Sequence, residues 1–185
     1  MAGPAARSHI VSDGTANSVS LLISILVRYP EIATVNFVPE GKILKFTFML
    51  SKPLSADLWE AFEKRLVESV QGYAALVHGE EPMLQVERRN HAEVSLVEIS
   101  RDIDTLTQEE ISLIIELART ELGSSLVTEG PIPDSVLDEE LLLQDEMIEN
   151  MLEDLKESIL QRKLIGFREE GRVFVFNKKT ERTKS

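Results

Sequence analysis

The residues best suited to chemistry in this chain are carboxylates, and nine of them fall within residues 138–158. Lys156 is the one basic residue of this stretch, in which Leu, Ile and Met recur at helical spacing. Asp145, Glu149 and Glu153 are four positions apart, so a helix places them on one side. Like charges at this spacing cost an isolated helix about 0.2–0.5 kcal/mol per pair. The pattern predicts either a solvated helix face or a surface that binds a positively charged partner.

The charge of the whole chain is concentrated in the same region. The net charge is −12, and residues 101–163 carry seventeen acidic and five basic side chains, whereas residues 164–185 carry three and six. We expect a non-catalytic interaction or regulatory protein whose acidic helix docks a basic protein partner through Asp145, Glu149 and Glu153. This function requires no cofactor. The partner is either another protein or the basic end of a second copy.

Two of the carboxylates also suggest a metal site. Glu146 and Glu149 have the spacing of half a divalent-metal site, and Mg²⁺ in helical enzymes is held by carboxylates from two helices. Glu109, Glu110 and Glu116 lie on the preceding predicted helix but mostly away from its apolar stripe, so the second half of the site is missing. The alternative function is a metal-dependent hydrolase of a phosphorylated substrate.

A third hypothesis, a ribosome- or RNA-associated factor, depends on a small basic cluster. Arg88 and Arg89 end a predicted strand and, with the basic C-terminal residues, are suited to contact a phosphate backbone. The net charge of −12 argues against a protein that coats nucleic acid, because such binding needs Lys and Arg to neutralise phosphates. The chain has no phosphate-binding glycine loop, no G-x-S-x-G motif and no cysteine.

Residues 17–101 form the first of two groups of elements that must position these side chains. They read as helix, strand, strand, helix, strand, strand, and PEGK joins the first two strands as a β-hairpin. Asn17 or Ser18 is the predicted N-cap of the first helix, and Ser55 caps the second. This order is similar to that of ferredoxin-like modules, which implies helices packed across a small antiparallel sheet.

Residues 102–177 form the second group, a helical hairpin followed by a β-hairpin, so the predicted fold class is α+β. Thr107 and Glu110 have the spacing of a capping box. The acidic helix is predicted to follow a cap at Ser135 and to run to about Lys163. Its predicted buried stripe consists of Leu141, Ile148, Met151, Leu152, Leu155 and Ile159. Residues 1–16 and the basic residues 178–185 read as flexible tails.

The closing hairpin is apolar on both faces, since Val173 and Val175 alternate with Phe174 and Phe176 around a turn that contains Gly171. A two-stranded hairpin cannot bury two faces by itself. It must therefore lie under the helices, join the first sheet or pair with another subunit. We favour the last two alternatives, which predict either a tightly joined two-part fold or a homodimer through this hairpin. No apolar segment reaches the roughly 20 residues that span a bilayer, so we expect a cytoplasmic protein without membrane contact.

Overall fold

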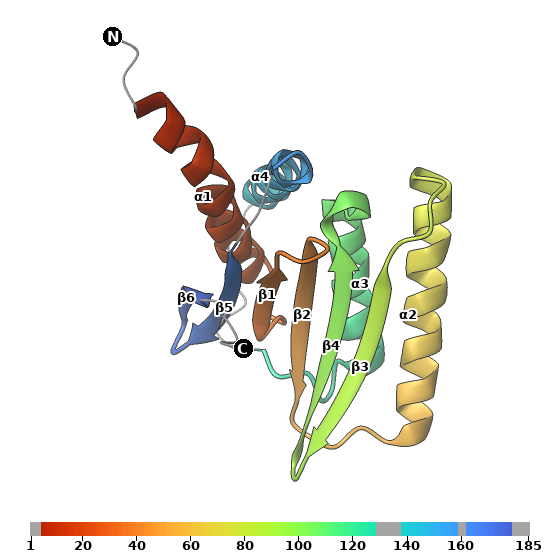
Figure 1. Cartoon of the computed structure of the whole chain (residues 1–185). Coiled ribbons are helices and arrows are strands. Elements are labelled where there is room, and N and C mark those ends of the chain that lie inside the picture. The colour runs from red at the N-terminus through yellow and green to blue at the C-terminus, as the bar shows by residue number, and fades with distance from the viewer. Residues whose placement is uncertain (1–4, 129–137, 159–161, 179–185) are drawn as a thin grey trace, which may run out of the picture.

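A single six-stranded antiparallel sheet organises the molecule, in the strand order β3-β4-β2-β1-β5-β6. The computed structural model describes residues 5–128, 138–158 and 162–178, with the side chains of residues 16–128, 138–158 and 162–177. The strands are β1 (Thr34–Val38), β2 (Ile43–Leu50), β3 (Leu84–His91), β4 (Val94–Asp102), β5 (Lys163–Glu169) and β6 (Arg172–Lys178). Figure 1 shows β5 beside β1 and β6 on the far side of β5. The predicted α+β class, the element order and the joining of the C-terminal hairpin to the first sheet are confirmed.

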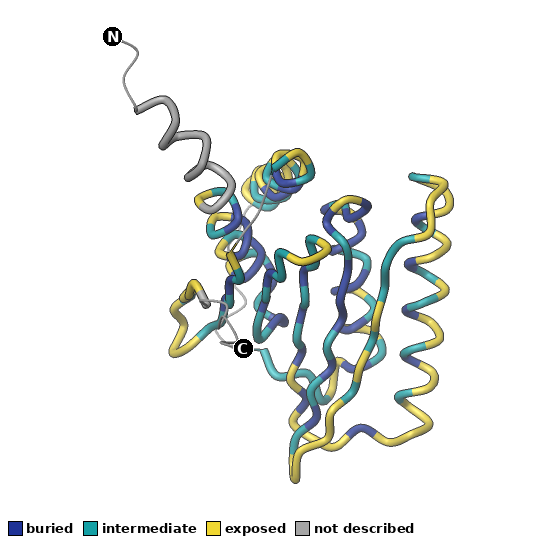
Figure 2. The backbone as a smooth tube through the Cα atoms, viewed as in Figure 1, coloured by how far each residue is buried: buried dark blue, intermediate teal, exposed yellow. Residues whose placement is uncertain are grey.

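The strand register gives the sheet one buried face and one open face. One row across the six strands belongs to the core or packs against it, and it consists of Val86, Ile99, Phe46, Val35, Gly166 and Val175. The adjacent row points to the other face and is half-buried or exposed, and it consists of Glu87, Glu98, Thr47, Thr34, Phe167 and Phe174. Figure 2 shows the resulting alternation of buried and half-buried residues along the central strands.

The helices pack against the buried face of the sheet and share one hydrophobic core with it. They are α1 (Ala5–Arg28), α2 (Ala56–Val77), α3 (Gln108–Leu122) and α4 (Asp138–Lys156), with a short 3-10 helix η1 (Ile103–Thr105) before α3. Figure 1 shows α3 behind β4. Helix α1 lies close to β5 at Gly166. A Cβ atom added to this glycine would lie only 3.0 Å from Cδ1 of Leu26. The glycine therefore allows α1 to approach the sheet.

Local signals in the sequence fix several helix starts and turns. The Ser55 side chain accepts the N–H of Leu58 at 3.3 Å, which confirms this residue as the N-cap of α2. Thr107 likewise accepts the N–H of Glu110 at 3.2 Å, as half of the predicted capping box requires. Gly171 has the positive φ of 77° that its hairpin turn demands.

Two predicted helix boundaries are wrong. Helix α1 begins at Ala5, so Ser18 is buried inside the helix and is not its cap. Helix α4 ends at Lys156, and Lys163 is the first residue of β5. The end of α4 is stabilised by Lys42 from the turn between β1 and β2, whose Nζ donates to the carbonyl oxygen of Lys156 at 2.7 Å. Ser135, Ile159, residues 1–4 and residues 179–185 lie outside the described residues.

A fully buried ion pair fixes the beginning of α3 against the sheet. Arg101 of β4 and Glu110 of α3 both have side chains that are 0% exposed, and Nη2 of Arg101 donates to Oε1 of Glu110 at 2.7 Å. Arg101 also donates to the carbonyl oxygens of Met83 and Thr105. Because Glu110 faces this arginine, its carboxylate does not complete the capping box predicted with Thr107. The capping box is therefore only half formed.

Candidate functional site

Helix α4 carries the predicted partner-binding residues, and its apolar side is part of the core. Ile148, Leu152 and Leu155 are 0% exposed, and Leu141 and Met151 are half-buried. The five residues of the predicted stripe that the structure describes thus face inward, toward α1, α3 and η1. This packing decides which carboxylates lie beside other elements and which point outward.

Asp145 lies beside α1 and forms an ion pair with the last residue of that helix. Nε of Arg28 donates to Oδ1 of Asp145 at 2.8 Å, and the two side chains are 16% and 22% exposed. The Arg28 guanidinium also lies 4.7 Å from the ring centroid of Tyr29, which is within cation–π range. Asp145 therefore links α4 to α1 within one chain.

Glu149 lies beside the start of α3. Its Oε2 accepts the backbone N–H of Gln108, the first residue of α3, at 2.8 Å. A carboxylate is favourable there, because the first N–H groups of a helix have no partner within the helix and carry partial positive charge. The Gln108 side chain extends the contact by donating to the Tyr29 hydroxyl at 2.9 Å and to Ser112 Oγ at 2.8 Å. Glu149 therefore helps to connect α4, α3 and α1.

Glu153 is the most exposed of the three predicted contact residues. Its side chain is 58% exposed, and Oε1 accepts a hydrogen bond from Nζ of Lys156 at 2.7 Å. This hydrogen bond lowers the pKa of the Glu153 carboxyl, so the group is ionised at neutral pH. The three residues line one side of α4 as predicted, but only Glu153 points fully to solvent. Partner binding through them stays a prediction.

The outward side of α4 combines carboxylates with large apolar side chains. Glu139, Glu146 and Glu153 are exposed and recur every seven residues, which places them along one line of the helix. Exposed apolar residues flank this line, namely Leu142 at 63%, Leu143 at 60% and Met147 at 57%. We call these six residues the α4 outer surface. The apolar members were available from the sequence, because they are the large residues of the helix that fall outside its buried stripe.

The two candidate metal ligands have different surroundings. Glu146 is exposed, whereas Glu149 is half-buried and accepts the N–H of Gln108. On α3, Glu110 is held by Arg101, Glu109 accepts the Tyr73 hydroxyl at 3.1 Å, and Glu116 contacts Arg119. Within the described residues, no three His, Asp or Glu side chains are grouped as metal ligands. The metal site stays a prediction.

The two candidate nucleic-acid residues point to opposite faces of the sheet. Arg88 is half-buried, donates to the carbonyl oxygen of Leu54 at 3.0 Å and lies 5.6 Å from the ring centroid of Trp59. Arg89, on the open face, is 60% exposed and lies 3.6 Å from Glu87. The strand therefore separates the pair instead of presenting both guanidinium groups together.

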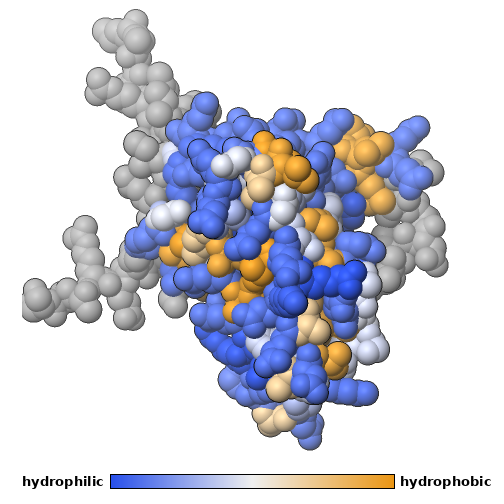
Figure 3. Space-filling view, turned by 90° about the vertical axis from the view of Figure 1, so that its right-hand side faces the viewer, coloured by the Kyte–Doolittle hydropathy of each residue, from blue (hydrophilic) through white to orange (hydrophobic). Residues whose placement is uncertain are grey.

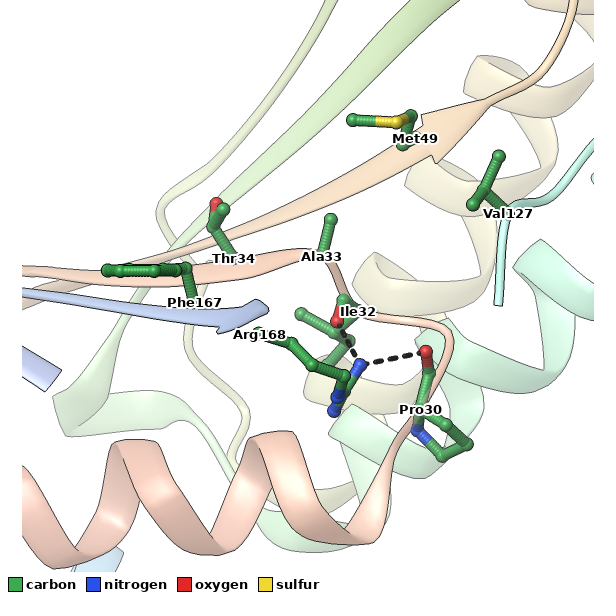
Figure 4. Close-up of a pocket in the computed structure, with 8 residues that line it drawn as sticks. All are labelled: Pro30, Ile32, Ala33, Thr34, Met49, Val127, Phe167 and Arg168. Atoms are coloured by element: carbon green, nitrogen blue, oxygen red, sulfur yellow. Dashed lines mark hydrogen bonds between the residues drawn. The ribbon is translucent and has the colours of Figure 1, made fainter. Parts of the chain in front are cut away.

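A small apolar pocket opens where β1 begins, next to β5 (Figure 4). Its volume is about 130 Å³, close to the roughly 150 Å³ at which an apolar cavity admits a benzene-sized group. Its walls are formed by Pro30, Ile32, Ala33, Thr34, Met49, Val127, Phe167 and Arg168. Nη1 of Arg168 donates to the carbonyl oxygens of Pro30 and Ile32, each at 3.0 Å, and Nη2 donates to that of Leu26. These bonds direct the guanidinium toward the main chain, so the pocket suits an apolar side chain.

No helix among the described residues is both long enough and apolar enough to cross a membrane. Comparison of the chain with protein-family models, with curated proteins and with solved structures finds no match.

Proposed function

We propose that this chain is a non-catalytic interaction protein in which α4 docks a basic, amphipathic segment of a partner protein. The outer surface of α4 supports this proposal, because it places Leu142, Leu143 and Met147 next to Glu139, Glu146 and Glu153. A purely solvated helix face would not need large apolar residues that are more than half exposed. A partner helix with apolar residues flanked by Lys or Arg complements both components.

The contact surface proposed here retains Glu153 and adds outward-facing residues. Asp145 and Glu149 bind Arg28 and the start of α3, so their carboxylates hold α4 in place while the outer surface meets the partner. A partner that binds Asp145 directly must displace Arg28. We therefore propose that neutralising the outward carboxylates reduces binding, whereas neutralising Asp145 mainly reduces the stability of the protein.

A capture experiment with matched variants tests the docking surface. The bait is the full chain beside a variant with Glu139→Gln, Glu146→Gln and Glu153→Gln. A control variant with Asp57→Asn, Glu60→Gln and Glu80→Gln removes the same charge from exposed positions on and after α2. Captured proteins are identified by mass spectrometry, and the affinity of each is then measured by isothermal titration calorimetry at two salt concentrations.

The proposal predicts a partner with a basic segment that binds the wild-type chain and the control variant equally. The triple variant on α4 should bind about tenfold more weakly, since each exposed charge pair contributes roughly 0.5 kcal/mol. A second variant with Leu143→Ser and Met147→Ser should weaken binding at high salt as well. Equal affinity for all four baits would exclude α4 as the docking surface and leave the solvated face as its explanation.

Assembly through the C-terminal hairpin is the second part of the proposal. Phe174 and Phe176 are 37% and 57% exposed on the open face of the sheet, where Phe167 stacks on both with centroid distances of 5.6 and 5.5 Å. Exposed aromatic clusters of this kind are typical of protein interfaces. We propose that two copies join here and that the dimer acts in the cytoplasm. Neither a metal-dependent hydrolase nor an RNA-associated factor gains a supporting contact among the described residues.

A further inference from the structure

The two edges of the sheet differ in how they are protected. Strand β3, at one edge, carries the charged residues Glu87, Arg88 and Arg89, and α2 contacts it and runs alongside (Figure 1). Figure 3 shows hydrophilic residues over most of the surface on this α2 side, with apolar patches between them. Charged residues and a covering helix are the devices by which natural sheets prevent pairing with other strands.

Strand β6, at the other edge, lacks this protection in its middle. Val173, Phe174, Val175 and Phe176 form an uninterrupted apolar run, with no charged residue or proline between them. Val173 and Val175 face the core side, whereas Phe174 and Phe176 are exposed on the open side. A seven-residue edge strand with four apolar residues in its middle is a template for pairing with another strand.

Helix α1 extends the apolar surface at the same end of the molecule. It contacts both β5 and β6, and Figure 1 shows the three elements together. Val19, Ile23 and Val27 form one row on α1 at intervals of four residues. Val19 packs against the core, but Ile23 and Val27 remain 39% and 57% exposed. The edge strand is therefore accompanied by uncovered apolar residues from a helix.

Charge makes the C-terminal hairpin a place where a second copy of this chain is repelled less than elsewhere. Two chains with a net charge of −12 repel each other over most of their surfaces. The hairpin of residues 163–178 lies outside the acid-rich region and contains four basic and two acidic residues, so the repulsion is weaker there. An antiparallel edge strand is also self-complementary, since a two-fold rotation brings it against its own copy.

We infer that β6 pairs antiparallel with β6 of a second copy, so that two six-stranded sheets become one continuous sheet. The inference rests on the proposed assembly through the hairpin and specifies its geometry. A two-fold axis perpendicular to the sheet keeps both helix layers on one side and both aromatic faces on the other. With the axis at Phe174, this residue lies opposite its own copy, and Val173 lies opposite Val175 of the second copy. The apolar pairs then meet across the junction.

Sedimentation equilibrium of the full chain tests whether a second copy binds at the β6 edge. The wild-type chain is expected to be a dimer at micromolar concentration, and Phe176→Lys should raise the dissociation constant at least about tenfold by placing a charge in the junction. Leu76→Lys is the matched control, because Leu76 is 89% exposed on α2 and its replacement should leave the dimer intact. Circular dichroism verifies that both variants are folded.

Disulfide formation tests the proposed antiparallel pairing of β6 with its copy. The chain has no cysteine, so a disulfide in a single-cysteine variant can form only between the two introduced cysteines. Opposed residues of antiparallel strands have Cα atoms about 4.5–5.5 Å apart, which a disulfide spans. Phe174→Cys should therefore oxidise to a covalent dimer, whereas Leu76→Cys should not. A wild-type chain that stays monomeric at all concentrations would exclude both the assembly and this geometry. A dimer that persists in Phe176→Lys and forms no disulfide in Phe174→Cys would exclude the edge pairing alone.

Discussion

Arg28 and Asp145 are separated by 117 positions in the sequence, yet Nε of the arginine lies 2.8 Å from Oδ1 of the aspartate. Arg28 is the last residue of α1, and Asp145 lies in α4. Arginine at the C-terminal end of a helix is favourable for the helix dipole, and the carboxylate neutralises it in turn. The ion pair therefore fixes α4 beside α1 and orients the outer surface of α4 toward solvent.

Removing either member of this pair should destabilise the protein moderately. Arg28→Met or Asp145→Asn should lower the free energy of unfolding by about 1 kcal/mol, since the pair is partly screened by solvent. Urea denaturation of the two single variants and the double variant yields the coupling energy. The exposed pair of Lys64 and Glu68 on α2 is the control and should show almost no coupling. Equal coupling for both pairs would contradict a structural role of Arg28.

The buried pair of Arg101 and Glu110 should be far less tolerant. Arg101→Met leaves the Glu110 carboxylate buried without its partner, which is expected to cost about 3–5 kcal/mol in thermal or urea unfolding. Adding Glu110→Leu should recover much of this loss, because a well-packed apolar pair can replace a buried ion pair. Arg89→Met, at an exposed site, should change stability by less than about 0.5 kcal/mol.

Two glycines should respond in opposite directions to alanine. At Gly166, a new Cβ would lie 3.0 Å from Leu26 Cδ1 and 3.3 Å from the carbonyl oxygen of Val35, so crowding should destabilise the protein by about 1–2 kcal/mol. At Gly72, inside α2, a Cβ would meet nothing within 4 Å. Gly72→Ala should therefore stabilise by about 0.5–1 kcal/mol through helix propensity. Differential scanning calorimetry of the two variants compares the signs directly.

The two tyrosines of the chain should make stability fall at alkaline pH. Burial raises the pKa of both Tyr29 and Tyr73 above the ordinary value of 10.0. Between pH 10.0 and the raised pKa values, the native state retains protons that the unfolded state has lost. The free energy of unfolding therefore decreases as the pH rises through this range. Urea unfolding across an alkaline pH series measures the slope, which Tyr29→Phe should make shallower than in the wild type.

The order of elements could be predicted from local patterns in the sequence. Alternating apolar residues identified the strands, Ser55 and Thr107 marked two helix starts, and Gly171 marked the last turn. These signals depend on residues only a few positions apart in the sequence, so they can be recognised without knowledge of the tertiary contacts. The end of α4 was missed, and Lys42, which stabilises it, lies 114 positions from Lys156, so a local pattern does not reveal this contact.

The difference between local signals and long-range contacts also explains which parts of the candidate site were predicted and which were missed. Helical spacing placed Asp145, Glu149 and Glu153 on one side of α4, and Lys156, the partner of Glu153, lies in the same helix. The partners of Asp145 and Glu149 come from other helices. Arg28 and Gln108 could not be assigned from spacing, because only the packing of α1 and α3 against α4 brings them close. Long-range contacts of this kind have no signature in a single sequence.

The pairing of β1 with β5 has a consequence for the growing chain on the ribosome. Thr34 of β1 lies opposite Phe167 of β5, so one side of β1 remains open until translation has passed β5. At about 5–20 residues per second, this delay is on the order of ten seconds. During that time β1 and β2 expose an edge and apolar side chains that the finished sheet covers. The nascent protein is consequently a candidate client of chaperones that act during synthesis.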